Sequence, residues 1–337
     1  MYQSVTAFRN FLFDHRIWVY KPTKFDIYTI SVGNLTVGGT GKTPMIEYLI
    51  HLLKSKYKIA TISRGYGRKT KGIIMADDTS TPETIGDEPA QFYRKFAPQV
   101  HVMVGEQRSV AIPRLLSQHP ETQVILLDDA YQHRWVLPHL NILLTDYNRL
   151  FFKDYVLPMG LLRESRNGAN RADVIVITKC PEELDYKKEY IKLKLSNYIT
   201  KPKVPLFFTN LKYGAPIPIY NPALFFDSEA DILLFCGIAN PKPLLEYLES
   251  NFNLVKTEAF ADHYSYKLKD IDQIIAIFSS MGNNKKCMLT TEKDMVKLVG
   301  NQFEEKLKGF PVFYVPIEVN FMENENAFRK LILKGLK

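Results

Sequence analysis

A glycine-rich stretch close to the start of the chain constrains the fold more strongly than any other feature. Residues 33–44 read GNLTVGGTGKTP and lie between an apolar run, residues 28–32, and an apolar pattern of helical period, residues 44–53. A strand that passes through glycines into a helix directs backbone N–H groups and a positive helix end toward phosphate oxygens. The pattern predicts a phosphate-binding loop, and the alternative is an ordinary glycine-rich turn between a strand and a helix.

Each residue type in the predicted loop suits a nucleoside triphosphate. Glycines let the backbone approach closely, a lysine reaches the β- and γ-phosphates, and a hydroxyl binds Mg²⁺. The general motif has a glycine where this chain has Thr36, so we expect a variant of the usual loop. The predicted nucleotide-binding residues are Gly38, Gly39, Thr40, Gly41, Lys42 and Thr43, with Lys42 also in a catalytic role and Thr43 also a metal ligand.

Short apolar runs alternate with helical patterns along most of the chain. In its first two thirds the runs are residues 28–32, 57–63, 100–104, 124–128, 141–145, 174–178 and 206–209. This rhythm is typical of a doubly wound parallel sheet. A turn-rich segment, residues 214–222, interrupts the rhythm, which then resumes on a smaller scale. We therefore expect an α/β protein with a P-loop NTPase-like domain, residues 25–215, and a second, smaller α/β domain, residues 216–337, that closes over the active site.

The net charge indicates the kind of partner to expect, and the cysteines indicate the redox setting. The 337 residues include 44 Lys and Arg against 36 Asp and Glu, a net charge of +8 that suits an anionic partner such as a nucleotide, a phospholipid or a nucleic acid. The sequence carries no recognised nucleic-acid-binding motif, so we expect no nucleic-acid partner. Cys180, Cys236 and Cys287 show no Cys-x-x-Cys spacing, which predicts a reducing cytosolic setting without structural zinc.

The first 24 residues, 1–24, form a separate element in our interpretation, an N-terminal amphipathic helix. Its apolar residues are Val5, Phe8, Phe11, Leu12, Trp18 and Val19, and its cations are Arg9, Arg16, Lys21 and Lys24. Asp14 and His15 interrupt the apolar pattern, which argues against a cleavable signal peptide. No run of 18 apolar residues that could span a bilayer occurs in the sequence. The two open interpretations are a helix that lies on a membrane surface and a helix that packs on the domain.

A pair of carboxylates ends one of the predicted strands. Asp128 and Asp129 close the apolar run at residues 124–128. In kinases and NTPases built on a phosphate-binding loop, an aspartate at such a strand end holds Mg²⁺ or its water shell. Adjacent carboxylates repel each other unless a cation is near, which favours a metal site over an acidic helix cap.

Two further motifs could provide acid–base groups. Asp87 and Glu88 precede a proline, where a carboxylate could accept the proton of an attacking hydroxyl, although such a pair is also an ordinary helix start. Asp262 and His263 follow the predicted strand at residues 255–260. A histidine oriented by a carboxylate can tune or relay a proton, and the alternative is a hydrogen-bonded loop histidine.

The motifs also occur together in a fixed order. GNLTVGGTGKTP, SRGYGR, GDEP, LDDAYQHR, LRE, DHY and TEKD lie between about residue 28 and about residue 295. This ordered set resembles the tetraacyldisaccharide 4′-kinase family, the lipid A 4′-kinases, whose own loop also lacks the first glycine. The resemblance implies transfer of the γ-phosphoryl group of ATP, with Mg²⁺, to the 4′-hydroxyl of tetraacyldisaccharide 1-phosphate, which gives lipid IVA. It also implies a peripheral enzyme on the cytoplasmic face of a Gram-negative inner membrane, with a glycolipid substrate and no obligate protein partner.

The resemblance assigns roles to individual positions. Lys42 and Thr43 keep their roles in the loop, while Asp87 resembles the catalytic base and His263 the histidine that acts with it. The metal ligands that it implies are Thr43, Glu88, Asp128 and Asp129. The positions expected to line the nucleotide or the glycolipid headgroup are Tyr66, Arg108, Gln132, His133 and Arg163. Asp87 and His263 would come from different domains, so the pair would form only when the cleft between them closes.

Two other classes of protein use a similar loop. A GTPase recognises guanine through an N-K-x-D sequence after a late strand, and residues 178–181 read TKCP, which argues against GTP. A membrane-peripheral nucleotide switch needs the loop and the metal ligands, but it has no need of a base for an acceptor hydroxyl. Asp87 and His263 therefore distinguish a kinase from a switch.

Overall fold

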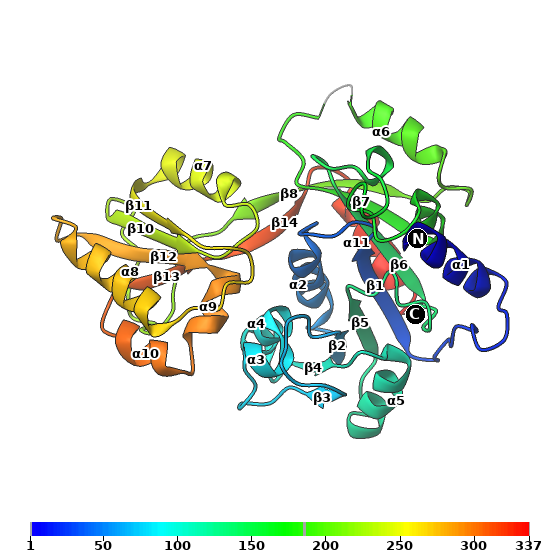
Figure 1. The fold of residues 1–337 in the computed structure, drawn as a ribbon, viewed down its shortest axis with the longest axis horizontal. Helices are drawn as coiled ribbons and strands as arrows, with labels where there is room; N and C mark the ends of the chain where they lie inside the picture. Colours follow the sequence, from blue (N-terminus) through cyan, green and yellow to red (C-terminus); the bar gives the residue numbers. More distant parts are fainter. Residues whose placement is uncertain (1, 185–186, 337) are drawn as a thin grey trace.

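The computed structural model describes residues 2–184 and 187–336, which form two α/β bodies joined by a pair of strands (Figure 1). The larger body is built on a nine-stranded sheet. In order across the sheet, its strands are β14 (Ile317–Phe321), β8 (Leu206–Tyr213), β7 (Val174–Thr178), β6 (Leu140–Asp146), β1 (Tyr28–Asn34), β5 (Val124–Asp128), β2 (Ile59–Ser63), β4 (Val100–Val104) and β3 (Ile74–Met75). Only the edge strands β14 and β3 run antiparallel to their described neighbours.

β1 lies where the strand order changes direction. The chain builds the sheet from β1 toward β4 on one side, places β5 next to β1, and then adds β6, β7 and β8 on the other side. In doubly wound sheets, ligands bind beyond the carboxyl ends of the strands at such a switch point. The predicted fold class, a doubly wound parallel sheet with a smaller α/β body, is confirmed.

Helices cover both faces of the larger sheet because successive residues of each strand point to opposite sides. In β7, Val174 and Val176 enter the core beneath α2, α4 and α11, while Ile175 and Ile177 face the side that carries α6. The helices of this body are α1 (Tyr2–Asp14), α2 (Lys42–Leu53), α3 (Pro82–Ile85), α4 (Asp87–Phe96), α5 (Arg108–Gln118), η1 (Phe151–Lys153), η2 (Arg166–Arg171), α6 (Lys187–Ser196) and α11 (Glu325–Lys334). Both faces therefore have an apolar core, and polar groups gather at the strand ends.

The smaller body is a five-stranded sheet inserted between β8 and β14. Its strands, in order, are β11 (Asn253–Ala259), β10 (Asp231–Cys236), β12 (Lys286–Thr291), β13 (Val312–Val315) and β9 (Ile217–Pro218), and its helices are α7 (Lys242–Asn251), α8 (Leu268–Ser280), α9 (Glu292–Leu298) and α10 (Gln302–Leu307). Leu233 and Phe235 of β10 face α8 and α10, while Ile232 and Leu234 face α7. This sheet is therefore also covered on both faces.

The end of the chain differs from the expected domain boundary. We expected residues 216–337 to belong to the smaller domain, but β14 pairs with β8 of the larger sheet and α11 packs against the core beneath α2. Pro316 separates β13 from β14, and an apolar strand pattern does not specify which sheet the strand joins. The smaller body is therefore an insertion whose two connections leave the larger body together.

Those two connections form a short antiparallel ribbon. β14 pairs with β8 from Ile317 opposite Tyr213 to Phe321 opposite Thr209. The backbone N–H of Gly214 donates to the carbonyl of Pro316 at 2.9 Å, which extends the pairing by one step toward the smaller body. Figure 1 shows this ribbon between the two bodies.

α1 is docked on the larger body by one side only. Phe13 is 2% exposed and its ring lies 4.9 Å from that of Trp135, while Nη2 of Arg134 pairs with Oδ1 of Asp14 at 2.7 Å. The opposite side exposes Val5, Phe8 and Phe11. Asp14, which interrupts the apolar pattern in the sequence, thus anchors the helix. Among the described residues, the structure has no helix long and apolar enough to cross a bilayer.

Candidate active site

The glycine-rich segment forms a loop at the carboxyl end of β1. The side-chain amide of Asn34 donates to the hydroxyl of Thr40 at 2.8 Å, and the hydroxyl of Thr178 donates to the carbonyl of Thr40 at 2.9 Å. Gly38 and Gly41 have φ values of 97° and 83°, a region that L side chains rarely adopt. Thr36, where the general motif has glycine, pairs instead with Leu162 in an isolated bridge. The segment thus forms a loop, as predicted, and Thr36, which departs from the general motif, joins it to Leu162.

Lys42 begins α2, and its ammonium points toward the carboxylate pair at the end of β5. Its Nζ lies 3.6 Å from Oδ1 of Asp129, whose two oxygens also accept from Nη1 of Arg163 at 3.0 Å each. Burial alone would raise the pKa of Asp129, but the charges of Lys42 and Arg163 outweigh it and lower that pKa. Asp129 therefore carries a negative charge that two cations share.

Asp128 lies in a different environment from its neighbour. Its side chain is 6% exposed, and Oδ1 has no hydrogen-bond partner within the described part of the chain. Burial, followed by the charge of Asp129, raises the pKa of Asp128 to about 7, and the charge of Glu88 contributes in the same direction. A buried, unpartnered carboxylate oxygen beside two further carboxylates fits a hard divalent cation such as Mg²⁺. The negative charges of Asp129 and Glu88 thus both act on Asp128, and the assignment of the three carboxylates to one metal stays a prediction.

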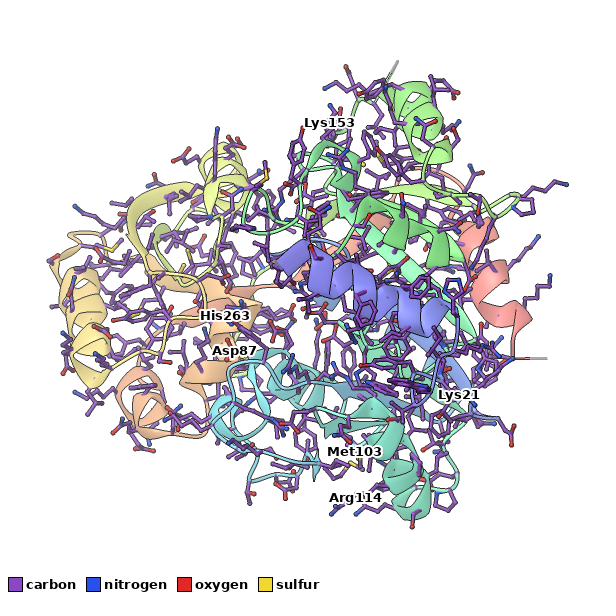
Figure 2. The ribbon with its side chains drawn as sticks, turned by 45° about the vertical axis from the view of Figure 1, so that its right-hand side comes forward. Lys21, Asp87, Met103, Arg114, Lys153 and His263 are labelled. Carbon is purple, nitrogen blue, oxygen red and sulfur yellow. The ribbon has the colours of Figure 1, made fainter. Side chains whose placement is uncertain are left out.

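Asp87 and His263 come from the two bodies and meet in the structure (Figure 2). Asp87 begins α4 and His263 lies in the turn after β11, and Nδ1 of His263 is 3.1 Å from Oδ2 of Asp87. Burial would raise the pKa of Asp87, but the hydrogen bond from His263 and the charge of Lys297 lower it overall. The structure therefore brings the predicted pair together across the boundary between the bodies, with the carboxylate ionised.

Backbone geometry fixes both members of this pair. Gly86, immediately before Asp87, has a φ of 96°, and a Cβ there would lie 3.0 Å from the carbonyl oxygen of Tyr66. His263 itself has a φ of 55°, a strained value for a residue with a side chain. Asp129 and Lys179 share this feature, with φ values of 45° and 55°. Such strain concentrates at functional positions, because the surrounding fold must hold them in place.

The buried Arg108 and the partly buried His133 form a cluster next to the carboxylates. Arg108 is 3% exposed, its Nη2 donates to the carbonyl of Asp128 at 3.4 Å, and its backbone N–H donates to Nε2 of His133 at 3.2 Å. Burial and then the charges of Arg108 and Arg9 lower the pKa of His133 to about 4. His133 is therefore neutral near pH 7, and the positive charge of the cluster resides on the arginines. Such a cluster suits an anionic ligand.

Tyr66 extends the site outward, whereas Gln132 is held inside the protein. Tyr66 is 71% exposed, and its ring centroid lies 5.6 Å from that of His263. The side-chain amide of Gln132 donates to the carbonyl of Asn34 at 2.8 Å and to Oε1 of Glu164 at 3.0 Å. Tyr66 thus lies beside His263 with most of its side chain exposed, while Gln132 joins the loop after β1 to the segment around residue 164.

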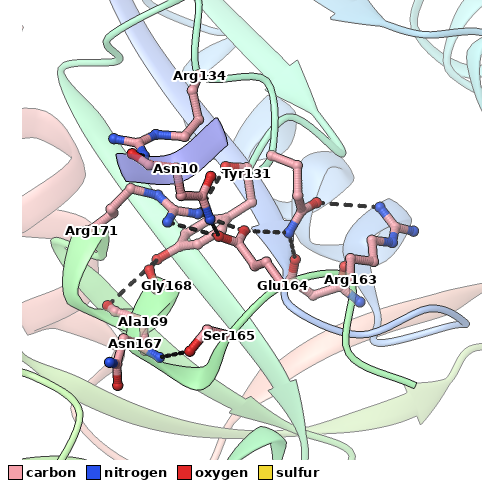
Figure 3. Close-up of polar contacts among 12 residues, drawn as sticks. Asn10, Tyr131, Arg134, Arg163, Glu164, Ser165, Asn167, Gly168, Ala169 and Arg171 are labelled. Atoms are coloured by element: carbon pink, nitrogen blue, oxygen red, sulfur yellow. Dashed lines mark hydrogen bonds and ion pairs between the residues drawn. The ribbon is translucent and has the colours of Figure 1, made fainter. Parts of the chain in front are cut away.

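Glu164 is a structural residue that sequence reasoning missed (Figure 3). It is 3% exposed and accepts from Arg171 through both oxygens, at 2.6 and 2.9 Å. It also accepts from Nδ2 of Asn10 at 2.8 Å, which ties α1 to the loop before η2. Position 164 lies in the LRE motif, so the signal was present, but a glutamate that is held by Arg171 and by two distant residues, Asn10 and Gln132, cannot be identified from spacing.

Lys179 is a second missed residue. Its Nζ pairs with Oδ2 of Asp146 at 2.9 Å and donates to the carbonyl of Gly39 in the loop. A pocket of about 540 Å³ adjoins it, lined among others by Tyr147, Asn148 and Pro243, the last of these from the smaller body. The TKCP sequence was the available signal, because its lysine stands where GTPases place the lysine of N-K-x-D.

The parallel sheet, the glycine-rich loop, and Lys42 facing a carboxylate pair define a P-loop nucleotide-binding protein of the NTPase-like class. The family model of the tetraacyldisaccharide-1-P 4′-kinases matches residues 1–337. The chain therefore belongs to the tetraacyldisaccharide 4′-kinase family, and the resemblance seen in the ordered motifs is confirmed.

Relatives and a solved structure agree with this membership. The tetraacyldisaccharide 4′-kinase of Flavobacterium johnsoniae is 45% identical over 100% of this chain and 95% of its own, and that of Flavobacterium psychrophilum is 46% identical over 99% and 93%. The crystal structure of an "apo" form of LpxK from Aquifex aeolicus in complex with ATP superposes with a TM-score of 0.75 at 29% identity, and covers 99% of this chain and 95% of that one.

Proposed function

We propose that this protein transfers the γ-phosphoryl group of ATP to the 4′-hydroxyl of tetraacyldisaccharide 1-phosphate, with lipid IVA as the product. The observation that carries the proposal is the contact of His263 with Asp87, at 3.1 Å, in a protein that also carries a phosphate-binding loop. A loop alone serves a switch as well as a kinase. A base for an acceptor hydroxyl is useful only in transfer.

The nucleotide and its metal are assigned to two sets of residues. We assign the triphosphate to Gly38, Gly39, Thr40, Gly41, Lys42 and Thr43, and the Mg²⁺ to Thr43, Glu88, Asp128 and Asp129. Mg²⁺ would neutralise charge that develops on the phosphates. The pocket beside Lys179 adjoins the loop at Gly39 and has room for the base and ribose of ATP.

Asp87 is proposed as the base. The contacts of His263 and Lys297 both fall on Oδ2, so Oδ1 is the oxygen that would accept the proton of the 4′-hydroxyl. Phosphoryl transfer passes through a loose transition state, so positioning of the hydroxyl matters more than strong basicity. A carboxylate with a lowered pKa can therefore serve, provided that it is held still.

Five further residues are candidate partners for the nucleotide or the anionic headgroup. We assign Tyr66, Arg108, Gln132, His133 and Arg163 to the nucleotide or headgroup region, with the arginines as the charged contacts. Arg163 already bridges to Asp129, so a bound phosphate would share it with that carboxylate. The Gln132 amide has internal partners, and it would act by holding this segment in place.

The location proposed for the enzyme is the cytoplasmic face of the inner membrane, as a peripheral protein without an obligate partner. Exposed apolar side chains gather on α1 and on the loop that follows η1, and the hydroxyl of Tyr2 donates to the carbonyl of Arg163 between them. The exposed residues are Tyr2, Val5, Phe8, Phe11, Trp18 and Val19 near α1, with Tyr155, Met159 and Leu161 in the loop. A surface of this kind can enter the interfacial layer, where a substrate with four acyl chains stays.

The direct test is transfer of labelled phosphate. Purified protein, labelled Mg·ATP and tetraacyldisaccharide 1-phosphate in mixed micelles should yield a product labelled at the 4′ position. The same lipid with its 4′-hydroxyl already phosphorylated is the control and should take up no label. ATP binding without any transfer would contradict the kinase and support the nucleotide switch.

Loss of the apolar face of α1 should weaken membrane binding. Phe8 and Phe11 are 63% and 49% exposed, and replacement of both by serine should lower affinity for anionic phospholipid vesicles by about tenfold or more, because less apolar area enters the interface. Sedimentation with vesicles measures this. Phe225→Ser is the matched control, since Phe225 is 91% exposed on the smaller body and should not matter. Equal binding by all three proteins would contradict the proposed surface.

A further inference from the structure

The TEKD motif, residues 291–294, begins α9 on the smaller body and faces α4 on the larger one. The backbone N–H of Asp294 donates to the hydroxyl of Thr291 at 3.1 Å, which caps the helix. Three ion pairs cross between the helices: Glu292 with Lys95 at 2.5 Å, Lys297 with Asp87 at 3.5 Å, and Lys293 with Glu88 at 4.0 Å. The motif and the turn that follows it in α9 thus bring two cations, Lys293 and Lys297, to the edge of the candidate site.

Lys293 makes its shortest contacts with the turn that carries His263. Its Nζ lies 3.0 Å from Oδ1 of Asp262 and 3.1 Å from Nε2 of His263. An ammonium group has three donors and no acceptor. The imidazole nitrogen at this distance must therefore present its lone pair, and the proton of a neutral ring is then on Nδ1.

The contacts on the other side of the ring select the same arrangement. Nδ1 of His263 faces Oδ2 of Asp87 at 3.1 Å, and an ionised carboxylate can only accept. The carboxylate that could accept from a protonated Nε2 is Asp262, whose Oδ2 is 3.9 Å away, beyond hydrogen-bond distance. Lys293 is closer to that nitrogen than Asp262 is. The contacts on both sides of the His263 ring therefore favour a proton on Nδ1.

We infer that Lys293 is a positioning residue that holds His263 as the neutral Nδ1–H tautomer, so that the imidazole can only donate to Asp87. The catalytic consequence rests on the proposed function. In the transfer step, the 4′-oxygen forms a new bond to the γ-phosphorus as the bond from that phosphorus to the β–γ bridging oxygen breaks, and ADP leaves with the electron pair. The O–H bond of the substrate breaks in the same step, and its proton goes to Asp87. Since Nδ1 already carries a proton, His263 orients Asp87 and does not relay its proton. Asp87 later releases the proton to water.

The tautomer of His263 can be measured directly on the full chain. Long-range ¹H–¹⁵N correlation spectra of histidine-labelled protein distinguish a ring nitrogen that carries a proton from one that does not. The chain has seven histidines, and the signal of His263 is identified by its loss in His263→Gln. The expected result is a protonated Nδ1 and an unprotonated Nε2. A wild-type ring with its proton on Nε2 would overturn the inference at once.

Three variants test whether Lys293 is the cause. Lys293→Met should release the ring to a mixture of tautomers and lower kcat by about 10²-fold, with ATP affinity unchanged, because the base is no longer held in position. Lys293→Arg retains a donor-only cation and should restore the Nδ1–H tautomer and most of kcat. Lys285→Met is the matched control: it removes a lysine that is 65% exposed and pairs with Asp227. That control should behave as wild type.

The spectroscopic and kinetic results separate two kinds of failure. If the wild-type protein transfers no phosphate, the proposed function fails, while the spectra still decide the tautomer. If Lys293→Met keeps the wild-type tautomer, Lys293 does not position His263 and the inference is wrong. If Lys293→Met is unstable, the wild-type and Lys293→Arg spectra still decide the tautomer: a proton on Nδ1 in both supports the inference, and a proton on Nε2 in either overturns it.

Discussion

Replacing Lys42 with alanine is expected to slow phosphoryl transfer by roughly 10²–10³-fold, the effect of removing one preorganised charge from a transition state. Lys42 begins α2, and its Nζ lies 3.6 Å from Asp129, so it is held at the phosphate-binding loop before nucleotide arrives. Its loss also leaves Asp128 and Asp129 with less positive charge nearby. We therefore expect weaker Mg·ATP binding as well as slower transfer.

Single-turnover transfer and nucleotide titration measure these two effects separately. Lys56→Ala is the matched control, because Lys56 is exposed just beyond the end of α2 and its loss changes the net charge equally. The control should transfer phosphate at the wild-type rate. A Lys42→Ala protein whose rate stays within threefold of wild type would contradict the role given to this loop.

The second large effect is expected for Asp87→Asn, which should lower kcat by about 10²–10⁴-fold, the usual contribution of a positioned base. Asparagine has nearly the same shape, and its carbonyl oxygen can still accept from Nδ1 of His263. The substitution therefore removes basicity and leaves packing in place. ATP binding should change little, because Asp87 begins α4 and is not one of the loop residues, 38–43, assigned to the triphosphate.

The pH dependence of the wild-type rate provides an independent check. His263 and Lys297 lower the pKa of Asp87 below its ordinary value of 3.8, so the carboxylate stays ionised throughout the neutral range. Protonation of this base should therefore not limit transfer between about pH 6 and pH 8.

Asp272→Asn, at an exposed position on α8, is the matched control for Asp87→Asn. Full turnover in Asp87→Asn would place the base elsewhere.

Features that depend on local spacing could be predicted from the sequence. The alternation of apolar runs predicted the parallel sheet, and the run of glycines ending in Lys42 and Thr43 predicted the loop at the end of β1. The carboxylate pair, Asp128 and Asp129, was expected at a strand end and lies there. Each of these follows from residues near one another in the chain, where backbone geometry decides the outcome.

Contacts between distant segments were harder to predict. The pairing of Asp87 with His263 was expected only through the family resemblance, since 176 residues separate the two. The hydrogen bonds that converge on Glu164 and the pairing of β14 with β8 of the larger sheet could not be predicted, because neither produces a periodic pattern in the sequence. The sequence also left open whether the first helix packs on the domain. It does so through Phe13 and Asp14, while Phe8 stays exposed. These outcomes depend on tertiary packing, which a linear pattern does not encode.

The ribbon of β8 and β14 determines how the smaller body can move. Two hydrogen-bonded strands resist stretching and sliding far more than they resist bending, so the inserted body should swing about the ribbon along one principal direction. The pairs between α4 and α9 would then separate together with Asp87 and His263. One distance between two fluorophores, one on each body, would suffice to follow the whole opening as a single coordinate. Assembly of the catalytic pair and expulsion of water from the cleft would be the same event.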